Sequence, residues 1–116
     1  RRVFAIFALC TVFIDMVTIS FSPLALECSS GEVYFKFTKK TTTSANRESF
    51  EILSGTDSLY TSPSLTNNQE RVLEVCIPQT TNNQYTLRMC TTSSYWANGA
   101  WLMIDGINGN RVFKGM

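Results

Sequence analysis

The sequence predicts an all-β protein: a small, antiparallel, jelly-roll-like β-sandwich preceded by an N-terminal apolar helix. Residues 28–116 alternate apolar and polar side chains with a period of two, in roughly six to eight short segments separated by turn residues. No segment after residue 26 has a convincing helical pattern. Residues 1–26 are a nearly continuous apolar run behind two arginines. Strands with one apolar face are buried by packing two sheets together, which gives the sandwich.

The N-terminal segment has the layout of a secretory signal, with a basic start, an apolar run and small polar residues at 27–31. The run approaches the roughly 20 residues that a membrane-spanning helix needs, so an uncleaved anchor is the alternative. Asp15 favours cleavage, because a carboxylate near the middle of a spanning helix costs about 2.5–3.5 kcal/mol on insertion scales. Pro23 makes the cleavage site imperfect. We expect a signal peptide over 1–26, a single domain over 27–116, and a secreted protein, or a membrane-anchored cell-surface protein if the segment is retained.

The expected strands follow one another along the rest of the chain. In the first of them Val33, Phe35 and Phe37 occupy alternate positions, so they share one face. Pro78 ends the strand expected at 71–77, because proline has no backbone N–H to donate to a neighbouring strand. Segment 101–104 is apolar at consecutive positions, as in a central strand covered on both sides. Strand patterns cover residues 33–38, 50–54, 59–61, 71–77, 85–90, 101–104 and 111–113.

Composition narrows the classes of function. After residue 26 the chain has eight basic side chains (ten less Arg1 and Arg2) and eight acidic ones (nine less Asp15), so its net charge is near zero and no basic patch indicates nucleic acid. Histidine is absent, which removes the commonest general base and transition-metal ligand. No nucleophile elbow, zinc motif or nucleotide loop occurs. We expect no enzymatic activity, no cofactor and no nucleic-acid partner. Lys39, Lys40 and Arg47 flank a polar loop and are interpreted as solvated surface.

The cysteines predict one disulfide. Of the four in the chain, Cys10 would leave with the signal peptide, and three would remain in an oxidising compartment. If the two strands that contain Cys76 and Cys90 are hairpin neighbours, their offset of four residues is about 13 Å at about 3.3 Å per residue. A disulfide tolerates a Cα separation of only about 7 Å. Cys28 is therefore expected to bond one of the other two, and we favour Cys28–Cys76, which would tie the mature N-terminus into the sheet. Cys90 would then be a free thiol, which either joins a second chain or is buried as a small apolar group.

A family resemblance rests on the second half of the chain. Its positions are Tyr85, Leu87 and Met89, then Trp96 and Gly99, then the apolar strand 101–104, then Val112 and Phe113. These residues resemble a repeat module of secreted and cell-surface proteins of single-celled eukaryotes, with the pattern Tyr-x-Leu-x-Met/Leu, an Asp-Ser-x-Gly-Asp loop, Trp-x-x-Gly, an apolar strand and Val-Phe. The resemblance covers roughly residues 28–116 and implies a β-sandwich outside the cell more than any activity.

The loop before the tryptophan departs from that pattern. Residues 90–95 contain no carboxylate, whereas the family's loop is acidic. Because Ca²⁺ takes about six to eight oxygen ligands, usually with several carboxylates, we assign no metal site.

The candidate ligand-binding residues are Tyr95, Trp96 and Asn98. An exposed aromatic ring beside a carboxamide suits stacking on a sugar and bonding of its hydroxyls. The alternative is that Trp96 packs on the end of the sandwich as part of its core. The sequence therefore predicts a non-enzymatic interaction or adhesion module that binds an extracellular protein or glycan through residues 95–99, with a carbohydrate-binding module using Trp96 and Tyr95 as the second hypothesis. Membrane contact is expected only through residues 1–26, if they are uncleaved.

Overall fold

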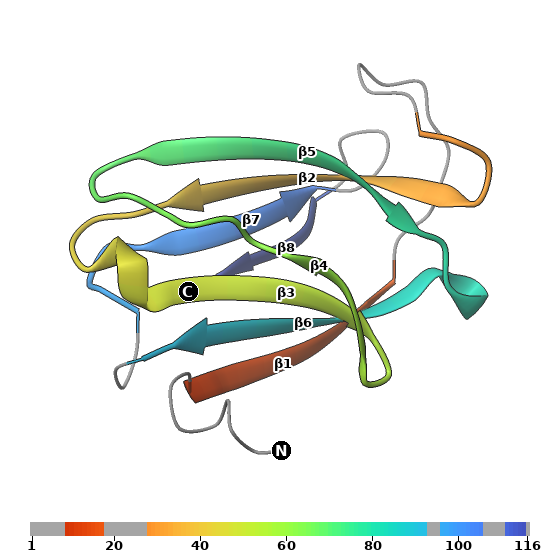
Figure 1. Ribbon diagram of the computed structural model, residues 1–116, viewed down its shortest axis with the longest axis horizontal. Helices are drawn as coiled ribbons and strands as arrows, with labels where there is room; N and C mark the ends of the chain where they lie inside the picture. Colours follow the sequence, from red (N-terminus) through yellow and green to blue (C-terminus); the bar gives the residue numbers. More distant parts are fainter. Residues whose placement is uncertain (1–8, 18–27, 93–95, 106–110, 116) are drawn as a thin grey trace.

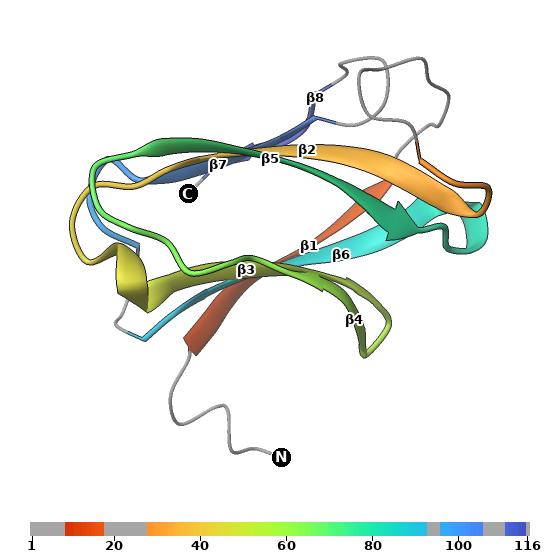
Figure 2. The same ribbon diagram turned by 45° about the horizontal axis from the view of Figure 1, so that its top comes forward.

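The computed structural model describes residues 9–17, 28–92, 96–105 and 111–115. Within these ranges two antiparallel sheets pack face to face, as Figure 2 shows, which confirms the predicted packing of two β-sheets. The strands are β1 (Leu9–Val17), β2 (Glu32–Lys40), β3 (Glu48–Ser54), β4 (Asp57–Thr61), β5 (Glu70–Pro78), β6 (Gln84–Thr91), β7 (Trp101–Asp105) and β8 (Arg111–Gly115), with short 3-10 turns η1 (Ala45–Arg47) and η2 (Thr81–Asn83).

The strand order is β1-β6-β3-β4 in one sheet and β5-β2-β7-β8 in the other. Only β3–β4 and β7–β8 are consecutive neighbours within a sheet, so every other described connection between successive strands passes from one sheet to the other (Figure 1). The expected hairpin of the two cysteine-containing strands is therefore wrong: β5 pairs with β2, whereas β6 pairs with β1 and β3. Alternation in a sequence indicates which face of a strand is buried, but it does not determine which other strand pairs with it.

The predicted disulfide between Cys28 and Cys76 is present, with a Cα–Cα distance of 5.6 Å. Its geometry comes from the pairing of β2 with β5, in which Tyr34 lies opposite Cys76. A turn closed by the Glu32 N–H donating to Ser29 O at 3.0 Å brings Cys28 back toward β5. The bond joins residues 48 apart in sequence.

The N-terminal segment differs from its prediction. Where the structure describes it, at Leu9–Val17, it forms strand β1 at the edge of a sheet and not the expected helix. Its backbone pairs antiparallel with β6. The other residues of 1–26 lie outside the described ranges, and cleavage or anchoring of that segment stays a prediction. Within the described ranges, no helix has the length and apolarity to cross a membrane.

The core lies between the two sheets. Phe35 and Phe37 of β2 are fully buried, and the alternation that predicted their shared face is confirmed. The ring of Phe37 lies 5.1 Å from that of Phe50 and 5.2 Å from that of Tyr60, centroid to centroid, distances at which aromatic pairs stabilise a core beyond their buried area. In β7 alternate residues are buried and the others half-buried, so this central strand is fully covered on one face only.

A candidate binding site at one end of the sandwich

The expected contact loop lies at the end of the sandwich where η1 and the segment before β7 meet (Figure 1). Two of its three predicted residues fall within the described ranges. Asn98 is exposed, Trp96 is buried, and Tyr95 lies outside those ranges. The site therefore has to be built from Asn98 and the side chains around it.

Trp96 does not present a ring for stacking. Its side chain is only 5 % exposed. The indole N–H donates to Cys90 O at 2.8 Å, and the ammonium of Lys39 lies 4.1 Å from the ring centroid. The segment from β6 to β7 thus uses this ring to close the end of the core, which is the alternative that the sequence left open. The stacking role predicted for Trp96 is wrong, because a sugar needs an accessible aromatic face.

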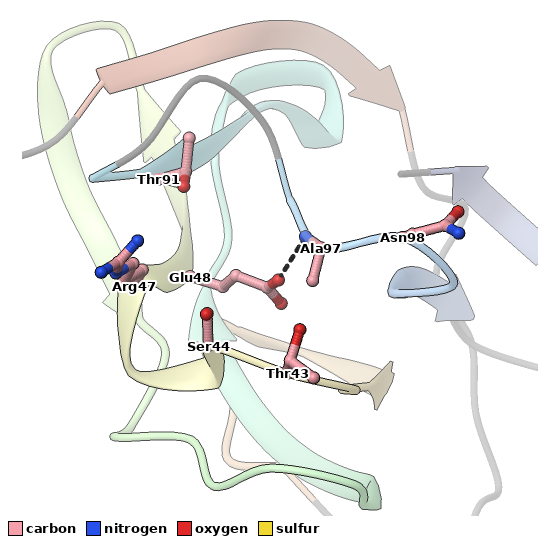
Figure 3. A pocket seen from close by; sticks show the side chains of 7 residues that line it. All are labelled: Thr43, Ser44, Arg47, Glu48, Thr91, Ala97 and Asn98. Carbon is pink, nitrogen blue, oxygen red and sulfur yellow. Dashed lines mark hydrogen bonds between the residues drawn. The ribbon is translucent and has the colours of Figure 1, made fainter.

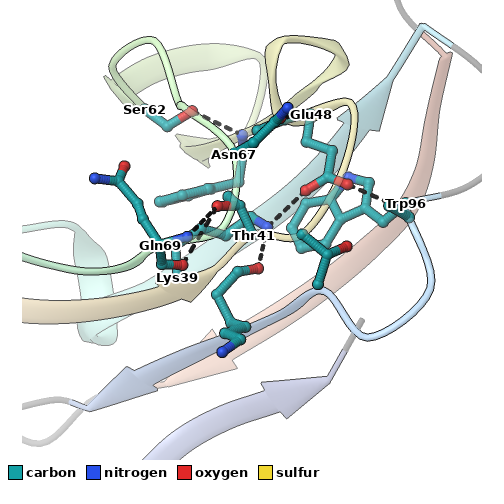
Figure 4. A network of polar contacts seen from close by, with 12 residues as sticks. Lys39, Thr41, Glu48, Ser62, Asn67, Gln69 and Trp96 are labelled. Carbon is teal, nitrogen blue, oxygen red and sulfur yellow. Dashed lines mark hydrogen bonds and ion pairs between the residues drawn. The ribbon is translucent and has the colours of Figure 1, made fainter.

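A buried ion pair lies beside that ring (Figure 4). Lys39 Nζ is 2.7 Å from Glu48 Oε1, and the two side chains are 0 % and 1 % exposed. Lys39 also donates to Lys40 O at 2.9 Å, while Glu48 Oε2 accepts the Ala97 N–H at 2.8 Å. The interpretation of Lys39 as solvated surface is therefore wrong. Each charge has the partners that a buried ion pair requires.

The electrostatics of Lys39 follow from its burial. Loss of hydration lowers its pKa, while the hydrogen bond and the negative charge of Glu48 act in the opposite direction. The nearby ring of Trp96 adds a cation–π contact that also favours the ammonium form. Groups on three different segments, Lys40 O, Glu48 and the Trp96 ring, thus contact the Lys39 ammonium group.

The alternation of the two strands explains why this pair is buried. Lys39 continues the inward positions 33, 35 and 37 of β2, and Glu48 precedes the inward positions Phe50 and Ile52 of β3. Opposite charges at the ends of two inward-facing rows are a signal that could have identified the pair from sequence. Neither residue stands in a recognisable motif.

The loop that follows β2 forms hydrogen bonds to two other segments. Thr41 Oγ1 donates to Thr66 O at 2.6 Å and accepts the Gln69 N–H at 3.0 Å. Thr42 Oγ1 donates to Asn98 O at 3.0 Å, which connects this loop to the segment before β7. The end of the sandwich is therefore a hydrogen-bonded framework, and side chains mounted on it have defined positions.

A pocket of about 300 Å³ opens in this framework. Figure 3 shows Glu48 pointing toward Ala97, with Ser44 and Thr43 nearby. The side chains of Thr43, Ser44, Arg47 and Asn98 are exposed, whereas Glu48 forms a buried wall. Among the residues that the structure describes, Arg47 makes no ion pair. The lining residues are Thr43, Ser44, Arg47, Glu48, Thr91, Ala97 and Asn98.

Sequence reasoning finds part of this pocket. It places Asn98 in the contact loop and Arg47 on the surface, and both are exposed. It misses Thr43, Ser44 and Thr91, because threonine and serine in a polar loop look like ordinary turn chemistry. Thr43 and Ser44 reach the pocket from the loop that leads into η1, and Thr91 reaches it from the end of β6.

The free thiol predicted at Cys90 is also wrong. Cys90 is disulfide-bonded, and among the described residues no cysteine is free. The described residues also contain no group of three histidine, cysteine, aspartate or glutamate side chains that could hold a metal ion.

Comparisons of the chain with protein-family models, with curated proteins and with solved structures gave no match. The resemblance to a cell-surface repeat module therefore stays a prediction. Function has to be argued from the chemistry of the pocket and its surroundings.

Proposed function

We propose that the protein is a non-enzymatic interaction module of the cell exterior that binds its partner at the pocket around Arg47 and Asn98. The observation that carries this proposal is the ring of exposed polar side chains around a pocket of about 300 Å³, with a buried ion pair beneath it. The Cys28–Cys76 disulfide supports an oxidising compartment.

Binding is favoured over catalysis by the way the buried charges are used. Both carboxylate oxygens of Glu48 already accept hydrogen bonds, from Lys39 and from the Ala97 N–H. A general base needs a lone pair within reach of its substrate. Here the carboxylate instead fixes the backbone next to Asn98, which is the role of a supporting residue in a binding site.

The exposed groups define the chemistry of the partner. Arg47 offers an exposed guanidinium that can bind a carboxylate through two parallel hydrogen bonds. Thr43 and Ser44 add hydroxyl groups, and the Asn98 amide can donate and accept. This combination fits an acidic, polar segment of an extracellular protein. A glycan remains the second hypothesis, with hydroxyls and amide as its contacts and no contribution from Trp96.

The experiment measures binding of the labelled full-length chain to the cells that produce it, before and after protease treatment, and to an array of neutral and acidic glycans. We expect protease-sensitive binding to cells that weakens about tenfold in Arg47→Ala and in Asn98→Ala, as loss of one central contact predicts. Asp57→Ala is the matched control, because Asp57 is exposed in the distant β3–β4 turn (Figure 1).

The outcomes separate the hypotheses. Protease-resistant binding, together with array binding that Asn98→Ala abolishes, would replace the protein partner by a glycan. Binding that is unchanged in Arg47→Ala and Asn98→Ala, or equally reduced in Asp57→Ala, would contradict the proposed surface.

A further inference from the structure

We propose that strand β1 is a permanent part of the folded domain, held to β6 by a disulfide between Cys90 and Cys10, and is not removed with a signal peptide. Three observations carry this inference: the backbone register of β1 on β6, the pattern of residues along β1, and the bonding of Cys90.

β1 pairs with β6 along its length, with one register shift between Cys10 and Val12. Val12, Ile14 and Met16 lie opposite Met89, Leu87 and Tyr85 of β6. All three of those β6 residues face the core, with 2 %, 0 % and 1 % of their surface exposed. The strand thus extends the sheet at the positions where its neighbour is most deeply buried.

The residue pattern of β1 matches this register. From Val12 to Met16 every second residue is aliphatic or methionine, and Phe13 and Asp15 occupy the alternate positions. Asp15 lies opposite Thr86, which alternates with the core-facing residues of β6. A charged residue in the row that alternates with the apolar one suits an edge strand better than a membrane-spanning helix. Apolar residues at every second position are expected of a strand that packs one face on a core.

The bonding of Cys90 identifies its partner by elimination. Cys90 is disulfide-bonded, and Cys28 and Cys76 are bonded to each other. The sequence contains four cysteines, so Cys10 is the one that remains. The backbone of residue 10 lies directly opposite Cys90 in the β1–β6 register. Directly opposite residues of antiparallel strands have Cα atoms about 4.5–5.5 Å apart, which lies within the range of disulfides.

The chemistry is ordinary thiol–disulfide exchange. The two thiols lose two protons and two electrons, and an S–S bond forms. The electrons reduce a protein or small-molecule disulfide of the oxidising compartment to its dithiol. The bond would fix an edge strand whose loss would expose the backbone N–H and C=O groups along one side of β6, a template for aggregation.

Peptide mapping without reduction tests the proposal on the full-length chain produced in an oxidising compartment. Digestion with trypsin and a glutamate-specific protease separates all four cysteines, into fragments 3–27, 28–32, 75–88 and 89–111. We expect fragment 3–27 to be linked to 89–111, and 28–32 to 75–88. Because fragment 3–27 contains the bond between residues 26 and 27, its recovery also shows that the chain was not cut there.

Thiol labelling provides a second readout, which does not need a folded variant. After denaturation without reduction, the wild-type chain should take up no maleimide, whereas Cys10→Ser should take up about one per chain, on fragment 89–111. Cys28→Ser is the matched control and should be labelled on 75–88 instead. The proposal is overturned if the wild-type fragment 89–111 carries a free thiol or pairs with 28–32, with 75–88 or with a second chain. It is overturned equally if the protein starts after residue 17.

Discussion

Two ion pairs between described residues have similar chemistry in different settings. Lys39–Glu48 joins the two sheets through the core, with side chains 0 % and 1 % exposed. Arg88–Glu51 joins two neighbouring strands on the outer side of one sheet, with side chains 30 % and 13 % exposed. A pair with partial access to water contributes less, because water already stabilises part of both charges. A buried pair depends entirely on its partner, so only the first can hold the site in place.

The largest effect is expected from Glu48→Gln. The amide can keep the hydrogen bond from the Ala97 N–H, but the buried ammonium of Lys39 loses its counter-charge. Leaving one member of a buried pair unpaired costs about 3–5 kcal/mol of unfolding free energy. Urea denaturation of the wild type and the variant measures this loss.

The double variant Lys39→Met with Glu48→Gln is the control for that measurement. Removing both charges should cost less than Glu48→Gln alone, because no unpaired ion remains in the core. A double variant that is less stable than Glu48→Gln would show that packing of the lysine stem, and not its charge, decides the outcome.

Trp96→Phe should have the next largest effect, since it disturbs the buried region without removing either charge. The ring persists, but Cys90 O loses the N–H that it accepts at 2.8 Å. An unsatisfied buried acceptor costs about 1–3 kcal/mol, and a shift of the thermal midpoint reports it. If the midpoint stays unchanged, water or another donor must reach that carbonyl.

A smaller effect is expected at alkaline pH. Tyr34 donates to Glu74 Oε2 at 2.6 Å, and its burial, together with that bond and the nearby negative charges, raises its pKa to about 12. The unfolded tyrosine ionises near pH 10, so its contribution is complete below pH 10 and is lost between pH 10 and about 12. We expect a loss on the order of 1 kcal/mol, which Tyr34→Phe should remove from stability curves measured across that interval. The lowered pKa of Lys39 acts in the opposite sense, favouring the folded chain as the pH approaches 10.5.

The smallest effect is expected from Glu51→Gln. Removing the charge that faces Arg88 should cost about 0.2–1 kcal/mol. The difference between wild type and variant should shrink in about 1 M NaCl, where charges are screened within about 3 Å. The cost of Glu48→Gln should persist in the same salt. Equal salt sensitivity of the two variants would remove the distinction between the buried and the partly exposed pair.

The sequence predicts the strands well where one face of a strand is buried. The alternation in β2, β3, β5 and β6 specifies which residues point inward, and the structure confirms the inward face of β2. It does not specify partners, so β5 and β6 are wrongly joined as a hairpin although they belong to opposite sheets. The segment Leu9–Val17 is missed because an apolar run behind two arginines has the composition of a leader, and only pairing with β6 reveals a strand.

The site is less predictable than the fold for a physical reason. Trp96 is buried because the segment after β6 packs over the end of the core. This tertiary contact cannot be predicted from the residues next to Trp96 in the sequence. The burial of Lys39 and Glu48 could have been predicted, because each lies two residues from a core-facing residue of its strand. The pocket forms where the connection between β2 and β3 meets the segment before β7, and it is lined by Thr43, Ser44, Arg47 and Asn98. Neither segment has a sequence feature of its own that identifies the pocket.

The position of β1 also has a consequence for biosynthesis. Its partner β6 begins at Gln84, after four other strands have been made. At about 5–20 residues per second, β1 leaves the ribosome several seconds before the strand that it pairs with. Because nearly every connection switches sheets, no early portion of the chain can complete a sheet by itself. During that interval β1 has no partner strand, and pairing of this non-local kind is slow to form.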